Sequence, residues 1–369
     1  MAGRVFVHPG PPKTGTTFIQ TLLYSNADAL RRHGLAVVGS QAQHFNVANE
    51  LLQTRSRRGK AVPEGAWERV QEQVRGFDGD ALLSCERYSL LQVQQIRRLV
   101  QDLEVGHGRE VHALLTLRDL AAVLPARWQE SLKNGDTHTW ADFCEKVAAH
   151  PRYLRRMTRA DASVRLWAEV LPAERVHVVT VPPSSAPRTL LLERFCAVLG
   201  IGLDALDTLE APRANASLDL VGAEVVRRLN ASDSVSLTPQ QHHSEVKAFL
   251  AARVLNRSRR GERPRLTPDA YDAARRETER VVERIESTGC PVTGDLADLS
   301  SAAAPEPDAA AQQIDADAVV EAAVEALGAL AERSSRRGRR LAALRQAAPG
   351  LQDGARPRRL ARVKALLGR

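Results

Sequence analysis

Aromatic residues are scarce in this chain of 369 residues, where Phe, Trp and Tyr together make up 4%. Hydrophobic residues still reach 43%, enough to build a substantial core. This composition favours Ala- and Leu-rich helices packed on Val-rich strands over a β-sandwich. No apolar run approaches the roughly 18 residues that a membrane-spanning helix needs, and the first residues lack a signal-peptide pattern. The sequence therefore predicts a cytoplasmic protein without a transmembrane segment.

Cysteine is also sparse, and its four positions are widely scattered: Cys85, Cys144, Cys196 and Cys290. None forms a C-x-x-C pair, which argues against both a zinc site and a disulfide framework. We expect four buried thiols and no bound metal.

Positive charge is unevenly distributed along the chain. Residues 333–369 contain twelve Lys or Arg and one acid, Asp353, so this segment carries a net charge of +11. The net charge of the whole chain is +8, which leaves −3 for residues 1–332. The rest of the chain is mildly acidic, and residues 301–312 have the low complexity of a linker. We predict a core over 1–220, a helical extension over 221–300, a linker over 301–312 and a basic helical tail over 313–369. The tail is suited to touching anionic surfaces, or is simply a solvated extension.

Four short, continuously apolar segments are separated by helical patterns, at residues 4–8, 81–85, 111–117 and 175–181. Alternating strands and helices of this kind predict an α/β fold with a parallel β-sheet flanked by helices, similar to P-loop NTPases, followed by a helical C-terminal part. Ligands bind to such sheets at the carboxyl ends of the strands. The residues after each strand should therefore converge on one crevice.

The strongest local pattern is HPGPPKTGTTFIQTLL at residues 8–23, where a strand, a Gly/Pro turn and a helix follow each other. The first N–H groups of a helix have no partner within it, so the helix start attracts an anion. Gly15 lets the backbone approach phosphate oxygens, Thr16 and Thr17 add hydroxyl groups, and Lys13 adds a positive charge. The plain alternative is a structural turn with a solvated lysine.

The spacing of Gly10 and Gly15 fits the start of a Walker A loop, but Thr16 occupies the position of the Walker lysine. The arrangement P-K-T-G-T-T instead resembles the 5′-phosphosulfate loop of sulfotransferases that use 3′-phosphoadenosine 5′-phosphosulfate (PAPS). The resemblance implies that residues 13–17 (Lys13, Thr14, Gly15, Thr16 and Thr17) bind PAPS. It also implies that Lys13 contacts the oxygen that bridges phosphate and sulfate.

A second pattern, LLTLRDLAAVLPARWQESLKNG at residues 114–135, places Arg118 and Asp119 directly after a buried strand. A guanidinium group at that position can bind a phosphate with two parallel hydrogen bonds. The pattern resembles the 3′-phosphate motif of the same family, which implies that Arg118 binds the 3′-phosphate of PAPS. The alternative is an ion pair between Arg118 and Asp119 at a helix start.

Two positions depart from the family pattern: Leu120 replaces a proline, and Ala126 stands where a phosphate-binding serine is expected. Ser131 or Arg127 could replace that serine. The resemblance covers roughly residues 4–220, and it is nearer to bacterial and heparan-type members than to the cytosolic enzymes for phenols and steroids.

Sulfuryl transfer requires a base that removes the acceptor proton. Glu86 follows a predicted strand end, where related enzymes carry a catalytic residue, and apolar surroundings would raise its pKa; the alternative is a salt bridge to Arg87. His44, expected in a polar loop, is the second candidate, because His44-Phe45 resembles part of an E-x-H-F-F acceptor segment in heparan-type enzymes. Arg213 is a further candidate phosphate contact, unless residues 211–220 are a loop in which Ser217 caps a helix over 218–229.

The resemblance implies a sulfotransferase that moves a sulfuryl group from PAPS to a hydroxyl or amine, leaving adenosine 3′,5′-bisphosphate. The acceptor would be a carbohydrate, a glycolipid or a small natural product, with no nucleic acid as partner. One alternative is a P-loop kinase or nucleotide-binding protein, which would need a Walker lysine and a metal-binding aspartate. Another is a non-catalytic module that binds anions through its basic tail.

Overall fold

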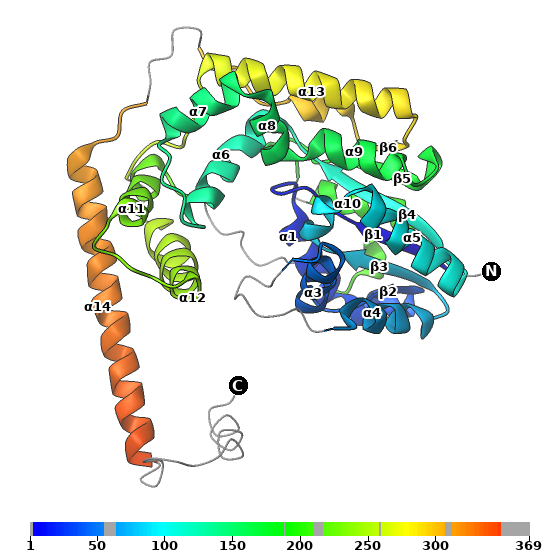
Figure 1. The fold of residues 1–369 in the computed structure, drawn as a ribbon, viewed down its shortest axis with the longest axis horizontal. Coiled ribbons are helices and arrows are strands. Elements are labelled where there is room, and N and C mark those ends of the chain that lie inside the picture. Colours follow the sequence, from blue (N-terminus) through cyan, green and yellow to red (C-terminus); the bar gives the residue numbers. More distant parts are fainter. Residues whose placement is uncertain are drawn as a thin grey trace.

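The computed structural model describes residues 3–54, 64–187, 189–209, 217–257, 260–306 and 312–347. Within these ranges, six strands form one sheet in the order β2-β3-β1-β4-β5-β6, and each neighbouring pair is parallel (Figure 1). The strands are β1 (Arg4–His8), β2 (Leu35–Val37), β3 (Asp80–Ser84), β4 (Glu110–Leu117), β5 (Val176–Thr180) and β6 (Val292–Thr293). The predicted α/β fold with a parallel sheet is confirmed.

The four strands expected from apolar runs are present, whereas the two outermost strands were missed. β2 has three residues and β6 has two, so neither is long enough to produce a hydrophobic pattern. β6 pairs with β5 through Val178 and Val179. It comes from a segment in which the sequence indicated only helices, so residues beyond 220 contribute to the sheet itself.

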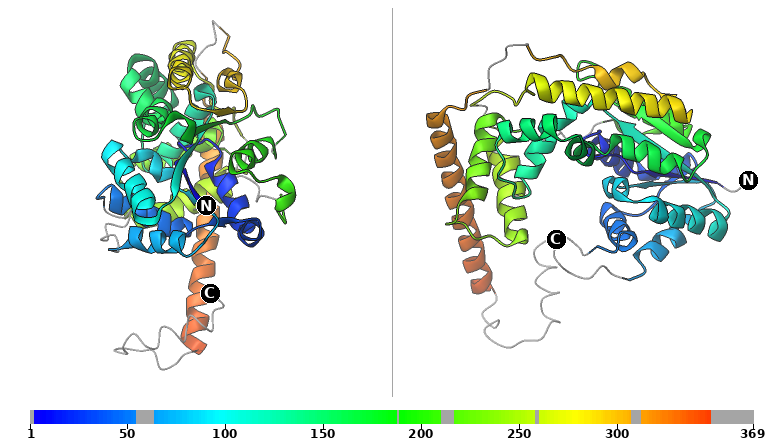
Figure 2. Two further views of the ribbon diagram at one scale, coloured as in Figure 1. Left: turned by 90° about the vertical axis from the view of Figure 1, so that its right-hand side faces the viewer. Right: turned by 45° about the horizontal axis from the view of Figure 1, so that its top comes forward.

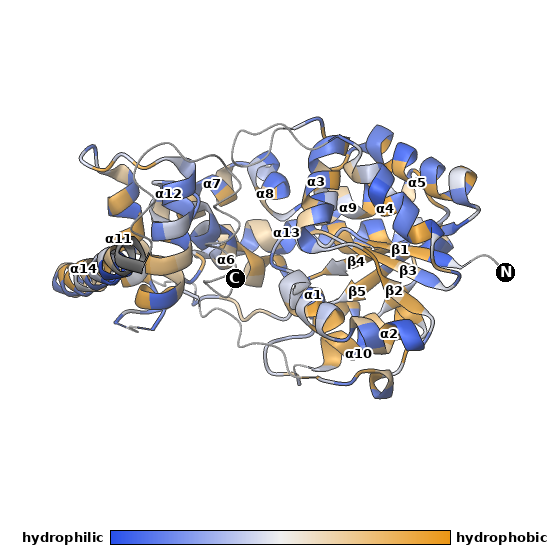
Figure 3. Cartoon of the chain, turned by 90° about the horizontal axis from the view of Figure 1, so that it is seen from below, coloured by the Kyte–Doolittle hydropathy of each residue, from blue (hydrophilic) through white to orange (hydrophobic). Residues whose placement is uncertain are grey.

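Helices cover both faces of the sheet because successive strand residues point to opposite sides. Val5 and Val7 belong to a large core shared with α3 (Gln41–Leu51), α4 (Ala66–Arg75), α5 (Val93–His107) and α9 (Ala160–Ala168). Phe6 belongs to a smaller core shared with α1 (Thr16–Ser25), α2 (Ala27–Arg32) and α10 (Thr189–Leu199). Figure 3 shows the apolar strands between these two layers.

The remaining described α- and π-helices lie mostly beyond the carboxyl ends of the strands, although one of them, α13, also packs along α9 (Figure 1). They are α6 (Leu120–Leu132), α7 (Trp140–Ala149), α8 (Pro151–Thr158), α11 (Leu220–Ala231), α12 (Pro239–Gln241), the π-helix η4 (His242–Leu255), α13 (Pro268–Thr288) and α14 (Ala316–Ala347). α14 runs as a long rod beside α11 and η4 at one edge of the molecule (Figures 1 and 2). Arg260 anchors it through Glu321 at 2.6 Å and Glu325 at 3.1 Å.

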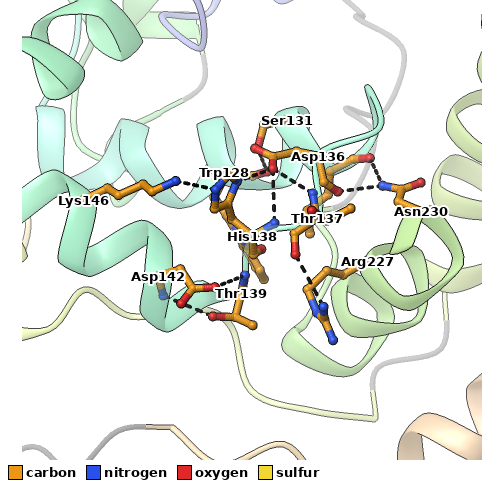
Figure 4. Close-up of polar contacts among 11 residues, drawn as sticks. Trp128, Ser131, Asp136, Thr137, His138, Thr139, Asp142, Lys146, Arg227 and Asn230 are labelled. Carbon is orange, nitrogen blue, oxygen red and sulfur yellow. Dashed lines mark hydrogen bonds and ion pairs between the residues drawn. The ribbon is translucent and has the colours of Figure 1, made fainter. Parts of the chain in front are cut away.

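The corner between α6 and α7 is held by a dense polar cluster (Figure 4). The side chain of His138 contacts Asp136 and Lys146, and its carbonyl accepts a hydrogen bond from Trp128 Nε1 at 3.0 Å. Asn230 of α11 donates to the carbonyl of Asp136 at 2.8 Å. This cluster therefore ties α6, which carries several residues of the candidate site, to α7 and α11.

Local capping was partly predictable. A capping box between Thr139 and Asp142 is present at the start of α7, where the sequence has the T-x-x-D pattern typical of such a box. The expected cap at Ser217 is wrong, because Asp219 caps α11 by accepting from the N–H of Gly222 at 2.7 Å. The four cysteines are buried free thiols, as expected. None of the described helices is both long and apolar enough to cross a bilayer.

Candidate anion-binding crevice

The loop that follows β1 lies where the connections of the sheet change direction. β1 pairs with β3 on one side and with β4 on the other, and β1 ends at His8. The chain then turns through residues 9–15 and enters α1 at Thr16. In open α/β sheets this switch point is the usual place for a ligand, and the free N–H groups of a helix start favour an anion.

Backbone conformation in this loop is unusual at two positions. Lys13 has φ of 69° and Gly15 has φ of 84°, both in the left-handed region. A lysine in this region costs of order 1 kcal/mol relative to an ordinary conformation. Residues in such conformations can point successive N–H groups into a concave anion site, as in phosphate-binding loops.

A buried polar network supports the loop from below. His8 Nδ1 lies 2.8 Å from Ser84 Oγ, and His8 Nε2 lies 3.2 Å from Thr116 Oγ1. Thr14 Oγ1 lies 2.8 Å from Thr116 Oγ1 and donates to the carbonyl of Pro11 at 2.7 Å. Burial lowers the pKa of His8 to about 3, so its ring is neutral near pH 7. The hydroxyl of Thr14 therefore holds the loop to the sheet.

Gly10 and Thr16 meet inside this network. A Cβ on Gly10 would lie 2.4 Å from Thr16 Oγ1 and 2.7 Å from His8 Nε2, so no side chain fits there. Thr16 is 3% exposed, and its hydroxyl has no hydrogen-bond partner in the described structure. Such buried groups without a partner are rare in native proteins, and each calls for a physical explanation. Thr17, by contrast, is exposed at the helix start.

The side chain of Lys13 forms an ion pair with α6. Its Nζ lies 3.0 Å from Glu130 Oε2, while Lys247 of η4 binds the other carboxylate oxygen at 2.5 Å. Burial would raise the pKa of Glu130, but the two ammonium groups outweigh it and hold the pKa at about 2. The side chain of Lys13 is thus not simply solvated, because the ion pair with Glu130 fixes the position of its ammonium group.

Arg118 brings the second sequence pattern to the same place. Its Nη1 donates to the carbonyl of Lys13 at 3.4 Å, across 105 positions of the chain. The alternative ion pair between Arg118 and Asp119 does not form. The carboxylate of Asp119 instead accepts hydrogen bonds from the N–H groups of Ala121 at 2.8 Å and Ala302 at 2.6 Å. Burial lowers the pKa of Arg118, and Asp119 opposes this shift. Arg118 therefore has donor groups left for an anion.

Of the two residues considered as substitutes for the missing serine at Ala126, the structure favours Arg127. The hydroxyl of Ser131 donates to the carbonyl of Trp128 at 2.8 Å, within the corner shown in Figure 4. Arg127 is half-buried, and its Nε has no partner among the described residues. Burial lowers the pKa of Arg127, whereas Glu86 and Glu130 raise it, so both carboxylates lie within electrostatic reach.

A cavity of about 590 Å³ opens beside this cluster of charges. It is lined by Lys133, Asn134, Leu237, Pro239, Gln240, His242 and His243. Burial and the charge of Lys13 lower the pKa of Lys133, which places these two groups near each other. His242 Nε2 lies 2.9 Å from the side-chain oxygen of Asn230, which leaves Nδ1 as the unprotonated nitrogen of a neutral ring. Burial and Lys247 lower the pKa of His242.

Glu86 is positioned differently from the expectation. It begins the short 3₁₀-helix η1 (Glu86–Leu90) after β3, as predicted, but its side chain is exposed rather than surrounded by apolar groups. Its neighbour Arg87 donates to Asn49 Oδ1 at 2.8 Å and stacks on Phe45. Glu86 is therefore a solvent-exposed carboxylate within electrostatic reach of Arg127.

His44 does not lie in a polar loop, and that expectation is wrong. It belongs to α3 and is fully buried, with Nδ1 2.8 Å from Tyr88 Oη and Nε2 2.5 Å from the carbonyl of Val38. Burial lowers its pKa to about 4. Both ring nitrogens are engaged inside the protein, so the geometry supports a structural role.

Four site residues were missed by the sequence analysis: Glu130, Lys133, His242 and Lys247. Glu130 follows Arg127 by three residues, a spacing that puts both on one helix face and could have revealed it. Lys247 lies 117 positions from Glu130, and no local pattern connects them. Arg213 lies outside the described residues. Within those residues, no group of three His, Cys, Asp or Glu side chains is arranged to hold a metal ion.

Comparison with known proteins adds no assignment. No protein-family model matches the chain, and the searches of curated proteins and of solved structures found no significant match.

Proposed function

We propose that this protein transfers a sulfuryl group from PAPS to a hydroxyl or amine of an acceptor. One observation carries the proposal: Arg118 and Lys13, which head the two patterns that resemble sulfotransferase motifs, lie in contact at the switch point of the sheet. PAPS carries its 3′-phosphate and its 5′-phosphosulfate on the same ribose, so its binding calls for cationic groups that lie close together. The Walker lysine that a kinase requires is replaced by the buried Thr16.

In this proposal the loop over residues 13–17 binds the 5′-phosphosulfate through backbone N–H groups at the start of α1. Lys13 exchanges its partner Glu130 for the bridging oxygen and stabilises the negative charge that develops as the sulfuryl group leaves. Arg118 binds the 3′-phosphate, and Arg127 supplies the donor group that Ala126 lacks. In the donor complex, we expect the hydroxyl of Thr16, which has no hydrogen-bond partner in the described structure, to gain one.

The acceptor would enter the cavity next to Lys133, which has the size of many small-molecule sites. Two groups are candidates to take the acceptor proton. Glu86 is exposed within electrostatic reach of Arg127, and His242 lines the cavity with one unprotonated nitrogen. Glu130 is a poor base, because its two lysine partners keep its pKa at about 2. We assign the proton transfer to Glu86, with His242 as the competing group.

Donor binding and turnover test the proposal separately. We expect adenosine 3′,5′-bisphosphate to raise the melting temperature of the protein, and ATP with magnesium to leave it unchanged. With labelled PAPS and a panel of sugar, glycolipid and phenolic acceptors, Lys13→Ala should lower turnover by two or more orders of magnitude with the fold intact. Arg32→Ala, which removes a cation from an exposed ion pair, is the control.

Each contrary result points to a different conclusion. Protection by ATP with magnesium alone would favour the kinase alternative. Protection by neither ligand would favour a non-catalytic module. Turnover of Lys13→Ala within a few-fold of the unmodified protein would remove the central assignment of this lysine.

A further inference from the structure

A second cavity, also of about 590 Å³, lies between η4 and α14, away from the strand ends. Ten residues line it: Phe249, Arg253, Val254, Arg257, Ala329, Glu332, Arg333, Arg336, Arg337 and Arg340. We call this feature the arginine groove. One wall comes from the π-helix and the other from the rod that Figure 1 shows along the outer edge of the molecule.

Positive charge in the arginine groove is only partly neutralised. Glu245 binds Arg333 at 3.2 Å and Arg337 at 2.8 Å. Glu332 binds Arg336 at 3.1 Å. Six guanidinium groups thus share two carboxylates, which leaves an excess of four positive charges around one cavity.

Three arginines of the groove have no acidic partner within the described part of the chain: Arg253, Arg257 and Arg340. Each is exposed and free to turn into the cavity. Guanidinium groups gathered in this way repel one another unless an anion joins them, and their planar donors match phosphate or sulfate oxygens. The groove is therefore suited to an anion with several negative groups.

The form of the groove argues against a nucleic acid strand. Single strands are bound by stacking their bases on open aromatic rings. Phe249 is the one ring in the lining, and the guanidinium group of Arg333 already lies over it, 4.2 Å from the ring centre. A volume of about 590 Å³ is that of a small-molecule site.

A membrane surface fits no better. Among the side chains of α14 that the structure describes, the large exposed apolar ones are Val320, Val324 and Leu327. Arg333 follows Val324 by nine positions, and Arg336 follows Leu327 by nine positions. With 3.6 residues per turn, nine positions correspond to about two and a half turns of the helix. The apolar stripe and the arginines therefore point to opposite sides of α14, and one flat bilayer cannot contact both.

We propose that the arginine groove binds a small soluble polyanion that carries two or more phosphate or sulfate groups. This site is separate from the crevice at Lys13, and it does not depend on the proposed sulfuryl transfer. The ligand would bridge η4 and α14, joining Arg253 and Arg257 on one wall to Arg336 and Arg340 on the other.

Titration calorimetry with inorganic tripolyphosphate tests the site on the full chain. The background is Arg118→Ala, so that binding in the other crevice is weakened. We expect the added pair Arg253→Ala and Arg257→Ala to weaken tripolyphosphate at least tenfold, and the loss to shrink at high salt. The matched control is the pair Arg276→Ala and Arg339→Ala, which removes two exposed arginines outside the lining and should change affinity less than threefold.

Equal affinity of the groove and control variants would overturn the proposal, since the basic tail or scattered surface charge would then explain the binding. Two further probes distinguish other partners. Vesicles containing phosphatidylglycerol and a single-stranded oligonucleotide are each tested for binding and for competition with tripolyphosphate. Binding of either one through Arg253 and Arg257, without measurable binding of tripolyphosphate, would also overturn the proposal. Both arginines are exposed, so their substitution leaves the core unchanged, and the melting temperature of the variant verifies this.

Discussion

Replacing Glu130 by Gln should destabilise the protein at neutral pH and much less in acid. The pKa of Glu130 falls from 4.5 to about 2 on folding because Lys13 and Lys247 outweigh the effect of its burial. One pKa unit corresponds to about 1.4 kcal/mol, so the ionised carboxylate contributes about 3 kcal/mol to stability at pH 7. The side chain is 22% exposed, so solvent screening reduces this only in part.

The sign of the pH dependence follows from the direction of the shift. A carboxyl group with a lowered pKa contributes its full stability above the pKa of the unfolded chain, near 4.5. The contribution is lost as the pH falls through the folded value, near 2. The difference between the unmodified protein and Glu130→Gln should therefore fall from about 3 kcal/mol at pH 7 to about 1 kcal/mol at pH 3.

Urea unfolding at pH 7, 5, 4 and 3 measures this difference directly. The control is Glu169→Gln, because Glu169 pairs with Arg165 on an exposed helix face at 3.7 Å. Exposed pairs of this kind contribute about 0.5 kcal/mol or less. The reasoning fails if the two variants lose the same stability at pH 7, or if the loss for Glu130→Gln is unchanged at pH 3.

Three further substitutions address the crevice. Arg118→Ala should weaken adenosine 3′,5′-bisphosphate by about 10- to 100-fold in calorimetry, and adenosine 5′-phosphosulfate much less; equal weakening would mean that Arg118 does not bind the 3′-phosphate. Gly10→Ala should cost about 1–3 kcal/mol in urea unfolding because its methyl group meets Thr16 Oγ1, whereas Gly106→Ala has free space and should cost nothing. Glu86→Gln should keep donor binding and abolish transfer, because an amide cannot accept the proton, and activity lost instead in His242→Ala would exchange the two roles.

The sheet could be predicted because its main strands are long and mostly apolar. Apolar residues make up most of residues 4–8 and 111–117, and the helices between the strands begin and end at recognisable residues such as Thr139. The edge strands β2 and β6 are too short to leave a pattern, and they form only because a longer neighbour offers hydrogen bonds. Their detection required the assembled sheet.

The part of the candidate site that lies within one short segment was also predictable. Gly10, Lys13 and Thr16 lie in one continuous strand, turn and helix, whose local sequence determines their arrangement. The prediction for His44 was wrong because the neighbouring residues in the sequence do not distinguish a buried histidine from an exposed one. Its partner Tyr88 is 44 positions away, and burial depends on that packing.

By itself, the sequence determined the parallel sheet, the turn and helix that follow its first strand, and the position of Arg118 directly after the strand at residues 111–117. These features depend on periodicity, glycine spacing and helix starts, which act over a few residues. Only the tertiary structure decided that Glu130 joins Lys13 to Lys247, and that Arg253 faces Arg340 across a groove. Such contacts depend on how distant helices pack, and helix packing is set by the summed burial of many side chains rather than by any local pattern.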